Sequence, residues 1–191
     1  MTDATHQRGW RTAQAALIGA ALIALAACGG GAQRVPPPSR VSVGIQPLSA
    51  EASAALASPQ RFVALAGSQS LYSVRASEMA VSRVSSSKLR AVADDIAHQQ
   101  LAIGAQLSFA GRRLDVLPSA ELDARHQAML DELRGASDFD ATYKRQQSAV
   151  LAEAWALHRA YAIQGSSPTL RPVAAMAAPI LGREVSALRK L

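Results

Sequence analysis

Two short Asp/His clusters hold the residues whose types and spacing could do chemistry. In the first, Asp94 and Asp95 precede His98 by four and three residues, so both carboxylates can reach the imidazole on one helical face. In the second, Asp123 precedes His126 by three residues. Carboxylate and imidazole groups at this spacing could bind a divalent metal or orient a general base.

The two histidines lie on different faces of their helices relative to the apolar residues. At 100° per residue, His98 points about 160° away from the apolar Ile96, which favours a surface ion pair with a neighbouring aspartate. His126 shares a face with Met129 and Leu133, which favours a buried imidazole hydrogen-bonded to Asp123 or to a carbonyl. We therefore expect structural contacts rather than catalysis from both.

No complete catalytic constellation occurs in the chain. A Gly-x-Ser-x-Gly elbow is absent, and the serines cluster where they can cap helices. The adjacent carboxylates Asp131 and Glu132 diverge on a helix. His158 lies beside Trp155, and packing against that ring is the simplest interpretation. The sequence predicts no catalytic residue.

The single cysteine marks an N-terminal targeting signal. Arg8 and Arg11 precede an apolar stretch, 13–27, that is too short to cross a membrane but suits a signal peptide. The stretch ends in Leu25-Ala26-Ala27-Cys28, which resembles a bacterial lipobox. This resemblance implies cleavage before Cys28 and acylation of its sulfur, and Gly29 in place of an aspartate favours the periplasmic face of the outer membrane.

The chain divides into three parts. Residues 1–27 form the predicted signal peptide, residues 28–48 a lipidated, Gly- and Pro-rich flexible linker, and residues 49–191 the folded domain. The domain is rich in alanine, with apolar residues at helical spacing and no useful alternation of period two. We expect helices at about 49–57, 58–84, 87–110, 119–134, 138–164 and 168–188. These elements predict an all-α, up-and-down four-helix bundle with an extra short N-terminal helix.

Charge and composition exclude several classes of function. The formal net charge is +6, but the arginines are scattered and no aromatic residues are interleaved with them, so nucleic-acid binding is not expected. No later apolar run reaches membrane-spanning length. The expected membrane contact is therefore the lipid at Cys28, and the protein partners are unknown.

A set of motifs in this order resembles a known family. Phe62-Val63 opens a long helix that contains Met79-Ala80; His98 lies in the next helix, Phe139-Asp140-x-x-Tyr143 follows, and Pro179 lies in the last helix. Over about residues 60–190 the chain is similar to the bacterial exported domain of unknown function 4142, described as a predicted outer membrane protein. The resemblance implies a ferritin-like four-helix bundle in the cell envelope, for a family with no settled activity.

The same resemblance bears on metal binding. Family members typically carry a Glu, an Asp-His pair and two further histidines at positions that are here Ser73, Ala97-His98, Leu151 and Glu184. Most of that ligand set is therefore missing. Of that set His98 remains, with Glu184 as a carboxylate substitute. Together with Asp95 and His126, these two residues are the candidate metal ligands.

The Phe-Asp-x-x-Tyr element has a simpler interpretation. Phe139 and Tyr143, four residues apart, are expected to attach their helix to the core. Asp140 falls in the first turn, where a negative charge favours the positive end of the helix.

Three functions remain open at this point. The first is a lipid-anchored envelope protein with a structural, stress-related or interaction role and no cofactor. The second is a divergent metal-binding bundle that holds a divalent metal. The third is a carrier of a small apolar ligand in a pocket between helices.

Overall fold

The computed structural model describes residues 47–191; the predicted signal peptide, Cys28 and nearly all of the predicted linker lie outside the described residues. In the described range all regular structure is helical, which confirms the all-α prediction. The elements are α1 (Ala50–Leu56), α2 (Pro59–Arg83), α3 (Ser87–Gly111), the 3₁₀ turn η1 (Arg112–Leu114), α4 (Ala124–Gly135), α5 (Phe139–Gln164) and α6 (Arg171–Arg189). None of these helices is both long enough and apolar enough to cross a membrane.

Side-chain caps account for most of the helix starts. Ser49, Ser58, Ser86 and Asp138 each accept a hydrogen bond from a backbone N–H in the first turn of α1, α2, α3 and α5. Each contact satisfies one of the amides that a helix leaves unpaired at its N-terminus. The short first helix and the start of the second at Ser58-Pro59 are as predicted.

Two helices begin later than the sequence predicted. The start of α4 is at Ala124 rather than near Ser119, because the Asp123 side chain supplies the cap. The start of α6 is at Arg171 rather than Pro168, because the preceding residues form a turn in which Leu170 N–H donates to the Ser167 carbonyl. Past Pro179, α6 continues as one helix.

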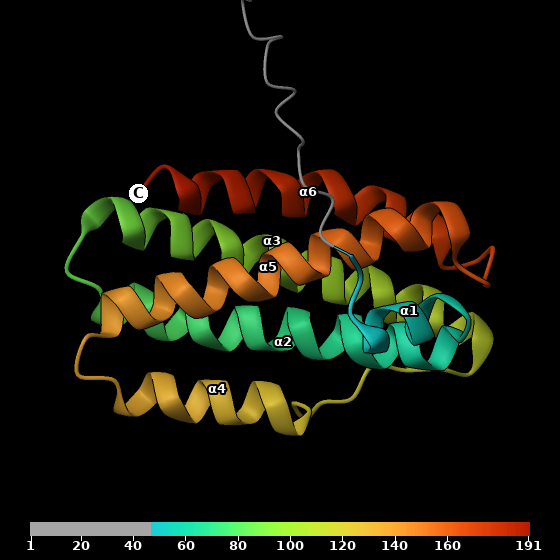
Figure 1. Ribbon diagram of the computed structural model, residues 1–191, viewed down its shortest axis with the longest axis horizontal. Helices are drawn as coiled ribbons and strands as arrows, with labels where there is room; N and C mark the ends of the chain where they lie inside the picture. Colours follow the sequence, from blue (N-terminus) through green and yellow to red (C-terminus); the bar gives the residue numbers. More distant parts are fainter. Residues whose placement is uncertain (1–46) are drawn as a thin grey trace, which may run out of the picture. The chain divides into compact units, whose positions relative to one another are not determined.

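The four long helices α2, α3, α5 and α6 form the bundle (Figure 1). Each packs against two neighbours: α2 contacts α3 and α5, and α6 contacts α3 and α5. The consecutive long helices α3 and α5 are therefore diagonal, and the chain between them runs back along the bundle through α4 (Figure 1).

This connection corrects the prediction of a simple up-and-down topology. α4 packs on the outside of α2 and α5 and buries only His126, Leu130 and Leu133. So narrow an apolar stripe covers one face of a bundle but cannot complete its core. One long crossover is the arrangement found in ferritin-like bundles.

Apolar side chains fill the bundle in two clusters. The larger contains Tyr72, Ile96, Leu133 and Leu181, and includes five buried alanines that let the helices approach closely. The smaller, which we call the end cluster, joins α1 to the end of the bundle where α2 begins, and it includes Phe62, Leu107, Leu157, Tyr161 and Leu170. On α2 the polar stretch Ser68-Gln69-Ser70 lies between the two clusters.

A close approach at Gly67 gives the first testable prediction. A Cβ added there would lie 2.6 Å from Cβ of Pro118, whereas one at Gly104 would be 3.4 Å from its nearest neighbour, Oγ of Ser70. We expect Gly67→Ala to lower the free energy of unfolding by about 1–2 kcal/mol, because overpacking outweighs the gain in helix propensity. The matched control Gly104→Ala, also inside a helix, should be neutral or stabilising. Urea unfolding followed by circular dichroism measures both, and equal shifts in the two variants would contradict the packing seen at Gly67.

Candidate functional site

The bundle interior contains a set of buried polar side chains contributed by all four long helices. Each is at most 6% exposed. We call them the interior polar residues: Gln69, Ser70, Ser73 and Ser77 of α2, Gln100 of α3, Gln146 and Gln147 of α5, and Glu184 of α6.

Hydrogen bonds from this set cross the helix interfaces. Ser70 Oγ donates to the Gln100 carbonyl at 2.7 Å, linking α2 to α3, and Gln100 Nε2 donates to Glu184 Oε2 at 2.7 Å, linking α3 to α6. Ser77 and Tyr143 share a hydrogen bond of 2.9 Å between α2 and α5. A buried polar group without a partner costs about 1–3 kcal/mol, so these contacts favour one register of the helices over others.

Glu184 is the only interior polar residue with a carboxyl group. Burial raises its pKa to about 7, although the hydrogen bond from Gln100 acts in the opposite direction. Within the described residues, four buried polar atoms of this set have no hydrogen-bond partner: Oε1 of Glu184, Oγ of Ser73, and Oε1 and Nε2 of Gln147. With a pKa of about 7, the carboxyl keeps its proton over much of the mildly acidic range, where an exposed glutamate is ionised.

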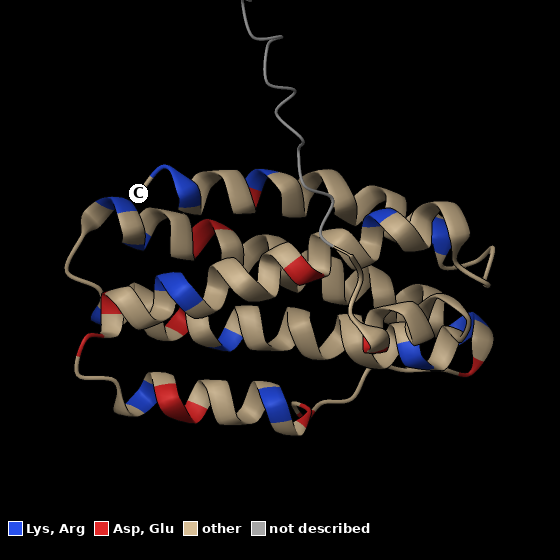
Figure 2. Cartoon of the chain, viewed as in Figure 1, with Lys and Arg blue, Asp and Glu red and all other residues tan. Residues whose placement is uncertain are grey.

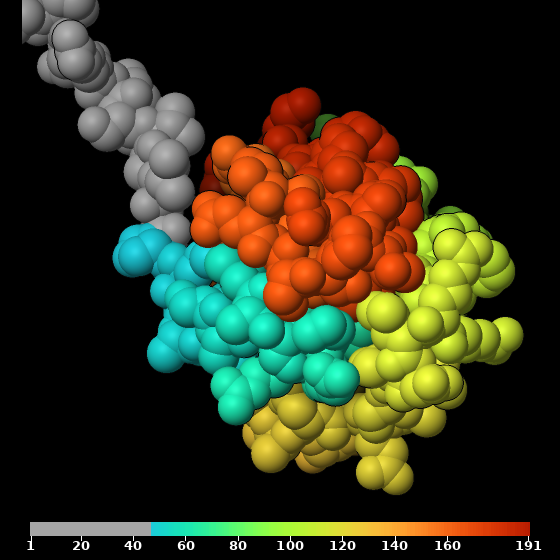
Figure 3. Space-filling model, turned by 90° about the vertical axis from the view of Figure 1, so that its right-hand side faces the viewer, coloured from blue at the N-terminus to red at the C-terminus, as the bar shows by residue number. Residues whose placement is uncertain are grey.

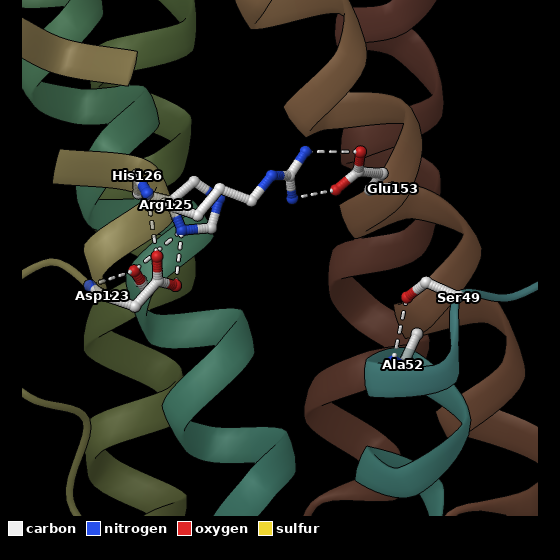
Figure 4. A network of polar contacts seen from close by, with 7 residues as sticks. Ser49, Ala52, Asp123, Arg125, His126 and Glu153 are labelled. Carbon is white, nitrogen blue, oxygen red and sulfur yellow. Dashed lines mark hydrogen bonds and ion pairs between the residues drawn. The ribbon is translucent and has the colours of Figure 1, made fainter. Parts of the chain in front are cut away.

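A second polar network joins α4 to α2 (Figure 4). Nδ1 of the fully buried His126 lies 2.7 Å from Oδ2 of Asp123 and 2.9 Å from Oγ of Ser68. Asp123 also accepts the His126 backbone N–H at 2.8 Å, and its own N–H donates to Ser68 Oγ at 3.0 Å. Burial alone would raise the pKa of Asp123, but the hydrogen bonds from His126 and Ser68 hold that pKa below its usual value.

The Ser68, Asp123 and His126 side chains do not have the geometry of a catalytic triad. In a triad the serine and the aspartate bond to opposite nitrogens of the imidazole, so that one nitrogen can accept the serine proton. Here both partners contact Nδ1. Because a carboxylate only accepts, Nδ1 carries the proton and cannot take one from Ser68. The network attaches α4 to the bundle.

The four candidate metal ligands lie apart in the fold. His98 is on the surface of α3, with its side chain 72% exposed and its Nδ1 2.8 Å from the Asp94 carbonyl. Asp95 is exposed on the same helix, Glu184 bonds to Gln100 inside the bundle, and His126 lies between α4 and α2. Across residues 47–191, no three His, Cys, Asp or Glu side chains form a group that could hold a metal ion.

The Phe-Asp-x-x-Tyr element attaches the start of α5 to its surroundings. Phe139 and Tyr143 are buried with their rings stacked 6.4 Å apart. The Asp140 carboxylate accepts hydrogen bonds from the backbone N–H and the hydroxyl of Ser85, so it also holds the turn between α2 and α3.

His158 packs against a different ring from the one expected. Its ring meets Phe62 edge-on at 5.4 Å, while the Trp155 ring lies beside Arg159 and Gly182. Burial lowers the pKa of His158 to about 4, so the imidazole is neutral at physiological pH.

The interior contact of Gln100 was not predicted from the sequence. This residue falls in phase with Ile96, Ile103 and Leu107, and a polar residue in an apolar stripe could have indicated an interior contact. Its partner could not be identified in the same way, because Glu184 is 84 residues away and only the tertiary fold brings the two together.

Glu184 gives a prediction about pH. In an unfolded chain its pKa is close to 4.5, the ordinary value for a solvated glutamate, whereas in the folded protein the pKa is about 7. Between these values the folded state binds the additional proton, so the contribution of Glu184 to stability falls as pH rises. We expect Glu184→Gln to match the natural protein near pH 4.5 and to exceed its free energy of unfolding by about 1–3 kcal/mol at pH 8.

Denaturant titrations at a series of pH values measure this difference. Other titrating groups such as His158 are present in both proteins, so their contributions to the free energy of unfolding cancel in the difference between variant and natural protein. Glu153→Gln is the matched control, because Glu153 forms a surface ion pair with Arg125 (Figure 4). A Glu184→Gln difference that stays constant from pH 4.5 to pH 8 would contradict the burial of the charge.

The network at α4 gives a prediction about stability. Asp123→Ala removes both the cap of α4 and the partner of a buried imidazole, whereas Asp138→Ala removes only the cap of α5. We expect a loss of about 2–4 kcal/mol for Asp123→Ala and about 1 kcal/mol for Asp138→Ala in thermal or denaturant unfolding. Equal losses would mean that the contact between Asp123 and His126 adds nothing beyond capping.

Comparison with known proteins places the chain in a family. The model of a family described as a domain of unknown function, DUF4142, matches residues 46–191. Neither the curated proteins nor the solved structures include a match. The match begins just before the described helices and covers all of them. The chain therefore belongs to the DUF4142 family.

Proposed function

We propose that this protein is a lipoprotein of the bacterial cell envelope, attached to a membrane by acyl chains on Cys28. The helical bundle then has a structural or interaction role, and no enzymatic one. The observation that carries the proposal is the segment Leu25-Ala26-Ala27-Cys28, which follows an apolar stretch of signal-peptide length.

Acylation at this cysteine would be sufficient for stable attachment to a membrane. Each buried methylene of an acyl chain contributes about 0.8 kcal/mol, and stable attachment takes more than one chain. A diacylglycerol on the sulfur together with an acylated N-terminus meets this requirement. The predicted linker, 28–48, then joins the lipid to the bundle.

The contacts inside the bundle support a role without catalysis. Gln100 and Glu184 bond to each other, Ser77 bonds to Tyr143, and His126 is enclosed by Asp123 and Ser68. In each case the partner is another side chain of the fold rather than a group directed into an open cleft. These polar residues are used for packing.

The two alternative functions have less support among the described residues. A metal-binding role lacks a group of three ligands across residues 47–191. A carrier of apolar ligands needs an enclosed pocket, whereas a hollow of about 440 Å³ lies at the surface between Phe109 and Pro172.

Acylation of Cys28 is the direct test. Cells expressing the natural chain should incorporate radiolabelled palmitate into the protein, which should fractionate with membranes, whereas Cys28→Ser should lose the label and most of the membrane-bound fraction. Cys28 is the one cysteine in the sequence, so no other thiol can take its place. Ala32→Ser, four residues further on, is the control and should keep both properties. Absence of label in the natural chain would overturn the proposal.

A further inference from the structure

The end of the bundle at which α3 and α5 finish and α6 begins exposes several large apolar side chains. Phe109, Leu117 and Ile163 are 58%, 61% and 76% exposed. All three lie next to residues of the end cluster, since Ala110, Val116 and Ala162 belong to it or pack against it. In the described residues, only Leu101 among the other large apolar side chains is more than half exposed.

A hollow lies in the same surface. It has a volume of about 440 Å³ and runs between the last turns of α3 and the first turn of α6, where Phe109, Arg113, Pro168 and Pro172 line it. A second hollow adjoins it, shares Pro168 and Pro172, and is bordered by Arg171. Figure 3 looks onto this end, where the orange-red residues of α5 and α6 adjoin the yellow-green end of α3.

Arginines surround these apolar groups. Arg112, Arg113 and Arg171 are exposed, and no ion pair involves them within residues 47–191. The Arg113 guanidinium lies over the Phe109 ring at 4.9 Å. The acidic residue of this turn is Asp115.

Three other arginines of the bundle pair with carboxylates. Arg125, Arg134 and Arg145 pair with Glu153, Asp131 and Glu132 on the side of α4 and α5, where blue and red segments alternate in Figure 2. The apolar end therefore combines exposed arginines that have no such partner with exposed apolar side chains. We call Phe109, Leu117, Ile163, Arg112, Arg113 and Arg171 the basic apolar end.

We propose that the basic apolar end docks on a membrane surface that contains anionic phospholipid headgroups. Exposed apolar side chains surrounded by arginines are complementary to such a surface, because the rings and alkyl groups enter the boundary region while the guanidinium groups pair with phosphates. The inference rests on the proposed anchor at Cys28, which places the domain beside a membrane.

The chain enters the fold at this same end. Pro47 is the first described residue, and Leu48 packs against the end cluster. The 20 residues from Cys28 to Pro47 can span at most about 70 Å when fully extended. An anchored chain therefore keeps the basic apolar end within reach of the bilayer and raises its local concentration there.

Vesicle binding by the unlipidated protein tests the inference separately from the anchor. The chain from residue 28 onward, with Cys28→Ser, is mixed with vesicles of phosphatidylglycerol and phosphatidylcholine, or of phosphatidylcholine alone, and bound protein is measured by flotation. We expect binding to the anionic vesicles that weakens as salt is raised, and much weaker binding to neutral vesicles.

Two triple variants remove the same charge from opposite ends. Arg112→Ser, Arg113→Ser and Arg171→Ser together should weaken binding to anionic vesicles at least tenfold. Lys88→Ser, Lys144→Ser and Lys190→Ser together, at the other end of the bundle, should leave it within about twofold. Phe109→Ser alone should weaken it several-fold, and circular dichroism should show unchanged folding because that ring is exposed.

Three results would overturn the inference. One is the absence of binding to anionic vesicles. Another is an equal loss of binding in the two triple variants, because binding would then depend only on the net charge of the protein. The third is a dimer in solution that Phe109→Ser converts to a monomer, because the surface would then belong to a second copy of the chain. Palmitate labelling of the natural chain is independent of all three, so failure of the anchor and failure of the docking surface remain distinguishable.

Discussion

The fold depends on pairing polar side chains that the bundle buries between its helices. Gln100 can bond to Glu184 only when α3 and α6 hold one register, and Ser77 can bond to Tyr143 only when α2 and α5 do. Alanine-rich interfaces alone specify register weakly, because small side chains of similar shape can slide past one another. The cost of leaving a buried polar atom unpaired supplies the discrimination that apolar packing lacks.

The same constraint explains the topology. α4 has too few apolar residues to be held by packing alone, yet Ser68, Asp123 and His126 attach its first turn to the middle of α2. With α4 placed there, the chain runs back along the bundle before α5 begins, so α3 and α5 become diagonal partners. A cap and a buried imidazole thus help to hold the connection between the long helices in place.

Local patterns predicted the helices well, because capping and periodicity act over a few residues: Ser58-Pro59 marked the start of α2 and Asp138 that of α5. The burial of His126 followed from its helical phase. The connection through α4 and the partner of Gln100 could not be predicted in this way, because both depend on contacts between distant parts of the chain. That the candidate ligands lie apart could also be learned only from the tertiary fold, because spacing along one helix does not give distances to residues on other helices.

In this account the interior of the bundle is used for packing, and attachment at Cys28 determines where the protein acts. Native mass spectrometry of the protein purified from membranes tests both statements in one measurement. The account predicts the mass of a chain that begins at Cys28 and carries acyl groups, with no stoichiometric ion or small molecule retained. A chain with an unmodified cysteine, or one that holds a metal ion in a fixed ratio, would contradict it.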